Sequence, residues 1–123
     1  MRALVIDDSR VMRKLLGGQL AGLGFEVVEA SDGAEGLQQL AAGPLPQVVL
    51  VDWNMPNMNG LDLIRAVRAR REWDAVRVLM VSSETSPAQI GEALAAGADE
   101  YLMKPFTADG LRAKLEMLGL VAV

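Results

Sequence analysis

Aspartates follow two short apolar runs of this sequence, and their side chains are the best suited to chemistry. Asp7 and Asp8 come directly after residues 3–6, and Asp52 comes directly after residues 48–51. Carboxylates that lie close together repel one another unless a proton or a cation intervenes. Because the chain contains no histidine and no cysteine, the favoured cation is Mg²⁺, which binds oxygen ligands, rather than zinc or copper.

A phosphoryl group is the natural companion of such a site, because Mg²⁺ usually combines one or two carboxylates with a phosphate. A carboxylate can also act as a nucleophile and form an aspartyl phosphate. Ser82 and Lys104 follow other apolar runs and offer a hydroxyl and an ammonium for phosphoryl oxygens. Since no glycine-rich loop of the G-x-x-x-x-G-K-[ST] type is present, we expect the phosphoryl group to come from another molecule rather than from bound ATP.

These residues are placed by short apolar runs that alternate with helix-length segments. We expect strands at residues 3–6, 25–29, 48–51, 76–81 and 100–103. The third and fourth runs are almost entirely apolar, as is typical of parallel strands buried on both faces. Apolar residues recur at helical spacing between the runs, and those we expect to face the core are Val11, Leu15, Leu16, Leu20, Leu61, Ile64, Val67, Ile90 and Leu94.

Capping signals support this division of the chain. Ser86 precedes Pro87 and lies three residues before Gln89, and Asp32 lies three residues before Glu35, so each pair predicts a helix start. Glycines at positions 22, 43 and 97 predict helix ends. The pattern therefore predicts a (βα)5 α/β fold, in which an open, doubly wound sheet of five parallel strands has helices on both faces.

Such sheets bind ligands beyond the carboxyl ends of their strands. The expected strands end at Asp7-Asp8, at Asp52, at Ser82 and at Lys104-Pro105. We therefore expect these groups to share one edge of the sheet, with each side chain held there by a buried strand.

Length and composition limit the function further. A chain of 123 residues that is 51% apolar and 23% charged predicts one globular domain. Its net charge of −4 argues against nucleic acid as a direct ligand. The apolar runs are too short for a signal peptide or a membrane span, so we expect a cytoplasmic protein without a membrane partner.

Four sets of residues resemble the receiver domain of two-component response regulators. They are Asp7-Asp8, VDWNMPNMNG with Asp52, VSSE with Ser82, and YLMKPF with Lys104 and Pro105. The resemblance keeps the order and spacing of the family over nearly the whole chain, and it is greatest to single-domain, CheY-like receivers. It implies that residues 1–123 form one receiver domain with the flavodoxin-like strand order 2-1-3-4-5.

The resemblance also implies a role for each site residue. Asp52 would be the phosphoacceptor, and Mg²⁺ would be held by Asp7, Asp8, Asp52 and the backbone carbonyl of Asn54. Ser82 and Lys104 would bind the phosphoryl oxygens. The Lys104–Pro105 peptide bond would be cis, and Tyr101 would be an aromatic switch residue that turns inward when Ser82 is drawn to the phosphate.

The partners implied by the resemblance are proteins. A sensor histidine kinase or a histidine phosphotransfer protein would donate the phosphoryl group, because this chain has no histidine of its own. A target protein would bind the face formed by the fourth helix, fifth strand and fifth helix, around Tyr101. The chain would be a signalling module that assists its own phosphorylation and dephosphorylation, and not an enzyme with an external substrate.

Three alternatives remain open from the sequence. The chain could be the receiver of a larger regulator whose DNA-binding or enzymatic output domain was removed. It could be a Mg²⁺-dependent phosphatase with an aspartate nucleophile, although such enzymes usually carry a second acid where this chain has Asn54. It could also carry a flavin nucleotide on the same architecture, but Asp7 and Asp8 would repel the phosphate of that ligand.

Two polar positions bear on the lifetime of the acyl phosphate. In the receiver family, the residue two positions after the acceptor and the residue two positions after the hydroxyl residue tune the access of water. Here they are Asn54 and Glu84. We expect this polar pair to favour fairly fast self-dephosphorylation.

Overall fold

The structure is a computed structural model that describes residues 1–122. Within this range five strands alternate with five helices, and a short 3₁₀ helix precedes the fourth strand. The elements are β1 (Arg2–Ile6), α1 (Arg10–Gly22), β2 (Glu26–Ala30), α2 (Gly33–Ala42), β3 (Val48–Val51), α3 (Gly60–Arg68), η1 (Arg71–Trp73), β4 (Arg77–Ser82), α4 (Pro87–Ala96), β5 (Glu100–Met103) and α5 (Ala108–Met117).

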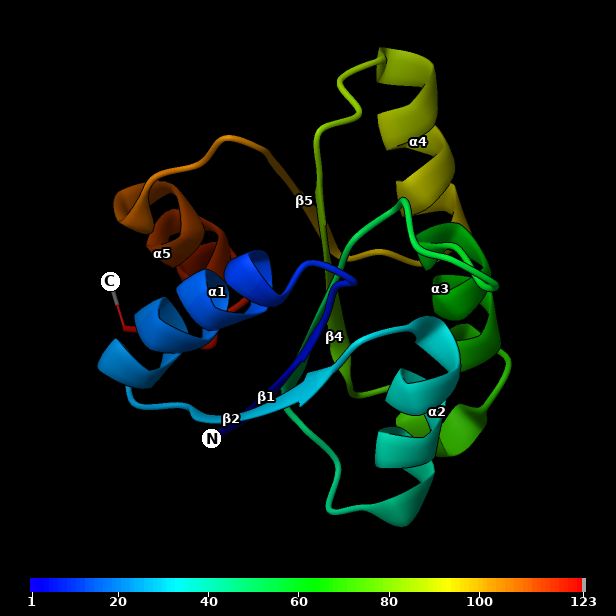
Figure 1. Ribbon diagram of the computed structural model, residues 1–123, viewed down its shortest axis with the longest axis horizontal. Coiled ribbons are helices and arrows are strands. Elements are labelled where there is room, and N and C mark those ends of the chain that lie inside the picture. Colours follow the sequence, from blue (N-terminus) through cyan, green and yellow to red (C-terminus); the bar gives the residue numbers. More distant parts are fainter. Residues whose placement is uncertain (123) are drawn as a thin grey trace.

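The five strands form one parallel sheet in the order β2-β1-β3-β4-β5, which confirms the predicted flavodoxin-like fold (Figure 1). β1 lies between β2 and β3. The chain runs from β1 to β2 on one side and then returns past β1 to β3 on the other, so the strand order reverses at β1. The register pairs Ile6 of β1 with Val51 of β3. Asp7 and Asp52, the next residue of each strand, therefore emerge side by side.

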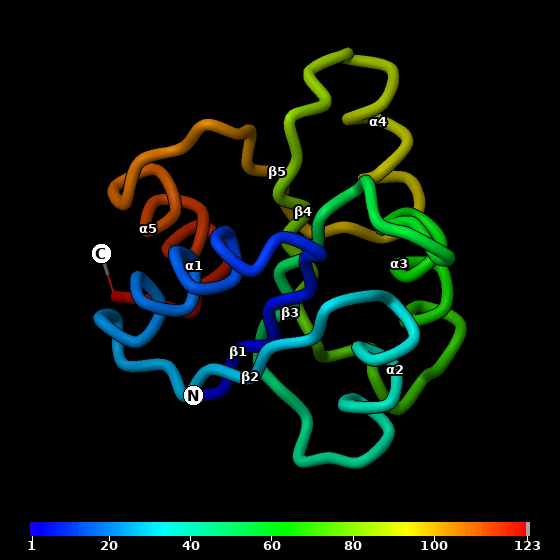
Figure 2. The backbone as a smooth tube through the Cα atoms, in the orientation of Figure 1, coloured from blue at the N-terminus to red at the C-terminus, as the bar shows by residue number. Residues whose placement is uncertain are grey.

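Helices cover both faces of the sheet. α1 and α5 pack on one face, and α2, α3 and α4 pack on the other (Figures 1 and 2). Side chains of a strand alternate between the two faces, so Ala3 and Val5 join the core under α1 and α5, whereas Leu4 and Ile6 join the core under the other three helices. All four residues of β3 are buried, so the strand holds the following residue, Asp52, in a defined position.

Side chains cap the start of each α-helix, where the first backbone N–H groups have no partner within the helix. The N-caps are Ser9, Asp32, Asn59, Ser86 and Thr107. The two predicted helix starts, at Asp32 and Ser86, are confirmed. Gly43 and Gly97 are C-caps as predicted, whereas Gly22 is the last residue of α1 itself.

Some residues that we predicted to face the core are exposed in the structure. Leu16 and Leu20 of α1 are buried, but Val11 and Leu15 are 80% and 48% exposed. Successive residues of a helix are about 100° apart, so the stripe through Val11 and Leu15 lies beside the one that faces the sheet. Leu94 of α4 is also 44% exposed. Among residues 1–122, no helix combines the length and the apolar character needed to cross a membrane.

Candidate functional site

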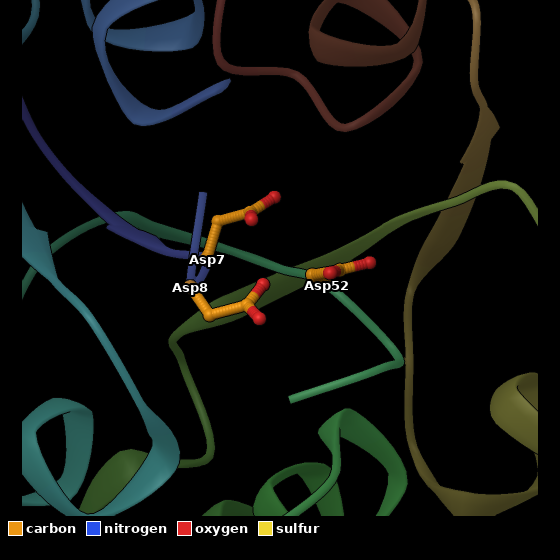
Figure 3. Close-up of side chains that lie close together, drawn as sticks. All are labelled: Asp7, Asp8 and Asp52. Carbon is orange, nitrogen blue, oxygen red and sulfur yellow. The ribbon is translucent and has the colours of Figure 1, made fainter. Parts of the chain in front are cut away.

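Three aspartates meet at the carboxyl ends of the neighbouring strands β1 and β3. Asp7 and Asp8 follow β1, and Asp52 follows β3, where its N–H donates to the carbonyl of Ile6 at 3.0 Å. One carboxylate oxygen of each aspartate lies within 4.8 Å of those of the other two, and Figure 3 shows the three side chains together. Asp7 and Asp52 are buried, whereas Asp8 is exposed. The predicted cluster of carboxylates is therefore present in the structure.

This donor set suits a hard divalent cation. All three side chains offer oxygen, and the chain has no histidine or cysteine that would favour a softer metal. Two buried carboxylates and one exposed carboxylate concentrate negative charge at this place, and Asp8 leaves it accessible to solvent. The residues fit a Mg²⁺ site of the kind that receiver domains use.

Lys104 brings one positive charge to the same place from the end of β5. Its Nζ lies 3.2 Å from Oδ2 of Asp7 and 3.4 Å from Oδ1 of Asp52. The peptide bond between Lys104 and Pro105 is cis. One ammonium leaves the charge of three carboxylates only partly balanced, so the site retains its attraction for a cation.

Asp52 lies where its charged form is disfavoured. Burial raises the pKa of Asp52 above its ordinary value, and the charges of Asp7 and Asp8 raise it further, while Lys104 lowers it. A cation or an additional positive charge at the site would favour the carboxylate form, which is the form that can act as a nucleophile.

Ser82 and Tyr101 are linked through one residue of the β4–α4 loop. Ser82 is fully buried as the last residue of β4, and its Oγ accepts a hydrogen bond of 3.1 Å from the N–H of Glu84. The hydroxyl of Tyr101 donates to the carbonyl of Glu84 at 2.7 Å. Tyr101 is 5% exposed, so its ring lies in the inward position.

Asn54 and Glu84 also meet. The side-chain amide of Asn54 donates to Oε1 of Glu84 at 3.1 Å, which joins the loop after Asp52 to the loop after Ser82. In the structure Glu84 is only partly exposed and binds residues on both sides of the site.

Gly60 is a site residue whose role the sequence did not reveal. The chain turns back after Asp52, and the N–H of Gly60 donates to the carbonyl of Trp53 at 2.8 Å. A Cβ at position 60 would overlap the main-chain oxygen of Asp52. Glycine therefore allows the start of α3 to close over the backbone of Asp52.

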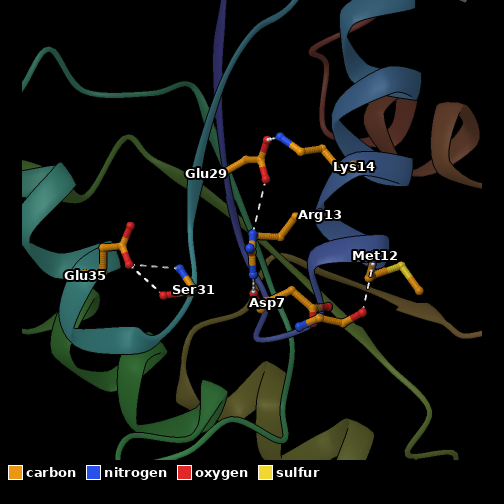
Figure 4. A network of polar contacts seen from close by, with 8 residues as sticks. Asp7, Met12, Arg13, Lys14, Glu29, Ser31 and Glu35 are labelled. Carbon is orange, nitrogen blue, oxygen red and sulfur yellow. Dashed lines mark hydrogen bonds and ion pairs between the residues drawn. The ribbon is translucent and has the colours of Figure 1, made fainter.

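Arg13 and Glu29, which the sequence did not single out, support Asp7 from the side of β2 (Figure 4). Arg13 of α1 donates through Nη1 to the main-chain oxygen of Asp7 at 2.6 Å and through Nε to Glu29 at 3.2 Å. Lys14 also binds Glu29, at 2.8 Å. No motif or spacing marked these residues, because they meet only when β2 lies beside β1.

Known proteins similar to this chain support the interpretation of the site. The family model for the response regulator receiver domain matches residues 3–116. The chain is 42% identical over 119 residues to chemotaxis protein CheY1 of Helicobacter pylori J99, with 96% of each chain covered. It is 44% identical over 119 residues to chemotaxis protein CheY of Pseudomonas aeruginosa PAO1, with 96% of this chain and 95% of the relative covered.

The solved structure of the chemotaxis response regulator CheY4 of Vibrio cholerae has the same fold. It superposes with a TM-score of 0.88 at 35% identity, over 95% of this chain and 97% of that one. Strand order, acidic cluster and sequence relationship lead to one conclusion: this protein belongs to the response regulator receiver domain family and is a CheY-like signalling module rather than a classical enzyme.

Proposed function

We propose that residues 1–123 form one receiver domain that accepts a phosphoryl group on Asp52 and thereby changes its affinity for a target protein. The observation that carries the proposal is the convergence of Asp7, Asp8 and Asp52 with the ammonium of Lys104, which lies within 3.4 Å of two of the carboxylates. A buried carboxylate beside a cation site and a lysine is the arrangement that phosphoryl transfer to aspartate requires.

In this proposal Mg²⁺ would be held by the carboxylates of Asp7, Asp8 and Asp52 and by the main-chain carbonyl of Asn54. When bound, the metal supplies positive charge to the phosphoryl oxygens and keeps Asp52 ionised. The donor set of oxygen atoms and the unbalanced charge of the cluster support this choice of metal.

The side chains of this protein would supply the rest of the reaction. A carboxylate oxygen of Asp52 attacks phosphorus, and the bond from phosphorus to the donor's histidine nitrogen breaks, with its electron pair leaving on that nitrogen. Lys104 and Ser82 donate hydrogen bonds to the phosphoryl oxygens, so that negative charge meets donors already in place. The donor would be a sensor histidine kinase or a histidine phosphotransfer protein.

The readout would be a change at the face formed by α4, β5 and α5. Tyr101 lies on β5 and is connected to Ser82 through Glu84. Movement of Ser82 toward a phosphoryl group would therefore change the hydrogen bonding of Tyr101. The named relatives are chemotaxis proteins, and we propose a chemotaxis-type target and a cytoplasmic location without direct contact to nucleic acid or membrane.

Beryllofluoride, a stable mimic of the phosphoryl group, tests this function directly. Trp53 is buried beside Asp52, so its fluorescence should change when beryllofluoride binds in the presence of Mg²⁺. The signal should vanish in Asp52→Asn and without metal. A wild-type protein that shows no change in fluorescence or in binding heat would contradict the proposed function.

A further inference from the structure

Arg13 connects the acidic site to the neighbouring strand β2. Its guanidinium donates to the main-chain oxygen of Asp7 at 2.6 Å and to the carboxylate of Glu29 at 3.2 Å. Its side chain is only 15% exposed, whereas that of Lys14, which also binds Glu29, is 62% exposed. Figure 4 shows Arg13 between the two acidic residues, with its guanidinium facing both.

The direction of the Asp8 carboxylate depends on the hydrogen bond from Arg13 to the main chain more than the direction of the Asp7 carboxylate does. Asp7 is fixed by several bonds, since its Oδ1 accepts from the N–H of Ser9 at 2.9 Å and its Oδ2 lies 3.2 Å from Lys104. The Asp8 carboxylate is exposed and forms no hydrogen bond or ion pair with any of residues 1–122. Its direction is therefore set by its own backbone.

The hydrogen bond from Arg13 to the carbonyl of Asp7 fixes the backbone at Asp8. The carbonyl of Asp7 and the N–H of Asp8 belong to the same planar peptide group. A donor that fixes the carbonyl oxygen of Asp7 therefore fixes the plane from which the side chain of Asp8 projects. Arginine suits this role because its planar fork presents donors to two acceptors at once, which a lysine ammonium on a flexible stem does not do.

We propose that Arg13, anchored by Glu29, is a positioning residue for the divalent-cation site: it orients the Asp7–Asp8 peptide so that the Asp8 carboxylate points into the acidic cluster. The inference rests on the Mg²⁺ site of the proposed function and deepens it. Arg13 reaches the main chain of the metal-binding segment and none of the three carboxylates.

The sign of the effect separates positioning from simple electrostatics. Arg13 carries a positive charge close to a cation site, so its charge alone opposes Mg²⁺. If charge were its only influence, Arg13→Gln would strengthen Mg²⁺ binding and Arg13→Lys would leave it unchanged. If Arg13 positions Asp8, both variants weaken Mg²⁺ binding, because both lose the fork that spans Asp7 and Glu29.

The test is a Mg²⁺ titration of the full chain without any phosphoryl donor, followed by Trp53 fluorescence and by calorimetry. A Trp73→Phe background removes the signal of the other tryptophan, which lies in η1 before the amino end of β4. We expect Arg13→Gln and Arg13→Lys to bind Mg²⁺ about tenfold more weakly, the low end of the effect of outer-shell partners of metal ligands.

Lys14→Gln is the matched control. It removes the same charge from the same carboxylate of Glu29, on the next residue of the same helix, but Lys14 forms no hydrogen bond or ion pair with Asp7. We expect its Mg²⁺ affinity to equal that of the wild type or to exceed it slightly. Thermal unfolding without metal checks that all variants are folded, and the milder Arg13→Lys keeps the test valid if Arg13→Gln is unstable.

Three results would overturn the inference. Tighter binding in Arg13→Gln would show that charge dominates. Unchanged Mg²⁺ affinity in both Arg13 variants, with a lower unfolding temperature, would show a purely structural contact. Equal weakening in Lys14→Gln would assign the effect to Glu29 alone. Failure of the wild type to bind Mg²⁺ at all would instead contradict the proposed function, on which the inference rests.

Discussion

The hydroxyl of Tyr101 donates a hydrogen bond of 2.7 Å to the main-chain oxygen of Glu84, whose N–H in turn donates to Oγ of Ser82 at 3.1 Å. A residue at the acidic site and a residue on β5 are thus joined through a single peptide segment. We expect this connection to make the inward position of Tyr101 sensitive to the position of Ser82.

We predict that Tyr101→Phe keeps the packing of the ring but lowers the free energy of unfolding by about 0.5–1.5 kcal/mol, the usual net value of one hydrogen bond. Urea denaturation measures this change. Affinity for beryllofluoride with Mg²⁺ should also fall, because the hydrogen bond that connects Tyr101 to the loop after Ser82 is lost. Ser83→Ala, at the exposed neighbouring hydroxyl, is the control and should change neither quantity. Unaltered beryllofluoride affinity in Tyr101→Phe would contradict the proposed coupling.

Gly60 should tolerate no side chain. In Gly60→Ala the new Cβ would overlap the main-chain oxygen of Asp52, and overpacking of this kind destabilises by about 1–3 kcal/mol. Denaturant unfolding should show this loss, and displacement of Asp52 should weaken Mg²⁺ binding as well.

Gly91→Ala is the matched control for Gly60→Ala. Gly91 lies in α4, where a Cβ would meet nothing within 4 Å. Alanine is the better helix former by about 1 kcal/mol, so Gly91→Ala should stabilise the protein. A Gly60→Ala variant that is as stable as Gly91→Ala would show that the turn after Asp52 has room to move.

Asp52 should make the metal-free protein sensitive to pH. Burial, together with the charges of Asp7 and Asp8, raises the pKa of Asp52 in the folded state. The contribution of this group to stability is therefore fully present below its unfolded pKa of about 4 and is lost as the pH rises through the folded pKa. Ionised Asp52 thus destabilises the metal-free fold at neutral pH.

We therefore predict that Asp52→Asn raises the unfolding temperature at neutral pH in the presence of EDTA, and that the difference shrinks as the pH is lowered through the folded pKa of Asp52. Thermal unfolding at a series of pH values measures it. Added Mg²⁺ should narrow the difference at neutral pH, because it binds the folded wild type more tightly than the variant. A variant that is less stable than the wild type throughout would be inconsistent with the raised pKa.

Asn54 and Glu84 should shorten the life of the aspartyl phosphate. The amide of Asn54 donates to the carboxylate of Glu84 at 3.1 Å, and this polar pair connects the loops after Asp52 and Ser82. In the variant Asn54→Leu, Glu84→Leu an apolar cover replaces the pair, and we expect the phosphoryl group to decay more slowly.

The decay can be followed by intact mass spectrometry after removal of the phosphoryl donor. Glu92→Leu, which replaces an exposed acid on α4, controls for the change in charge and should decay at the wild-type rate. Decay of the double variant as fast as that of the wild type would refute the expectation.

The sequence predicted most of the fold because its signals were local and consistent. Continuous apolar runs marked β3 and β4, and Asp32 and Ser86 marked helix starts through short-range capping. The aspartates of the site could be predicted because they lie within two residues of the end of a strand, and neighbouring parallel strands end at the same edge of the sheet. The strand order came from the resemblance to receiver domains and not from the pattern of residues.

Predictions from the sequence failed for residues whose surroundings depend on contacts between distant segments of the chain. Val11 and Leu15 have the spacing of core residues, yet they lie on the exposed side of α1, because helical periodicity does not say which stripe meets the sheet. Arg13 and Glu29 are 16 residues apart and meet only through the pairing of β1 with β2. Gly60 looks like an ordinary turn glycine until the main chain of Asp52 is placed beneath it.

Intact mass measured after incubation with Mg²⁺ and acetyl phosphate shows whether Asp52 accepts a phosphoryl group. We predict one phosphoryl adduct that hydroxylamine removes, and that is absent from Asp52→Asn and from samples with EDTA. Beryllofluoride titration of the same samples, followed by Trp53 fluorescence, covers the case of rapid hydrolysis. An adduct that persists in Asp52→Asn, or a wild-type protein with neither adduct nor beryllofluoride response, would contradict the assignment of Asp52 as the phosphoacceptor.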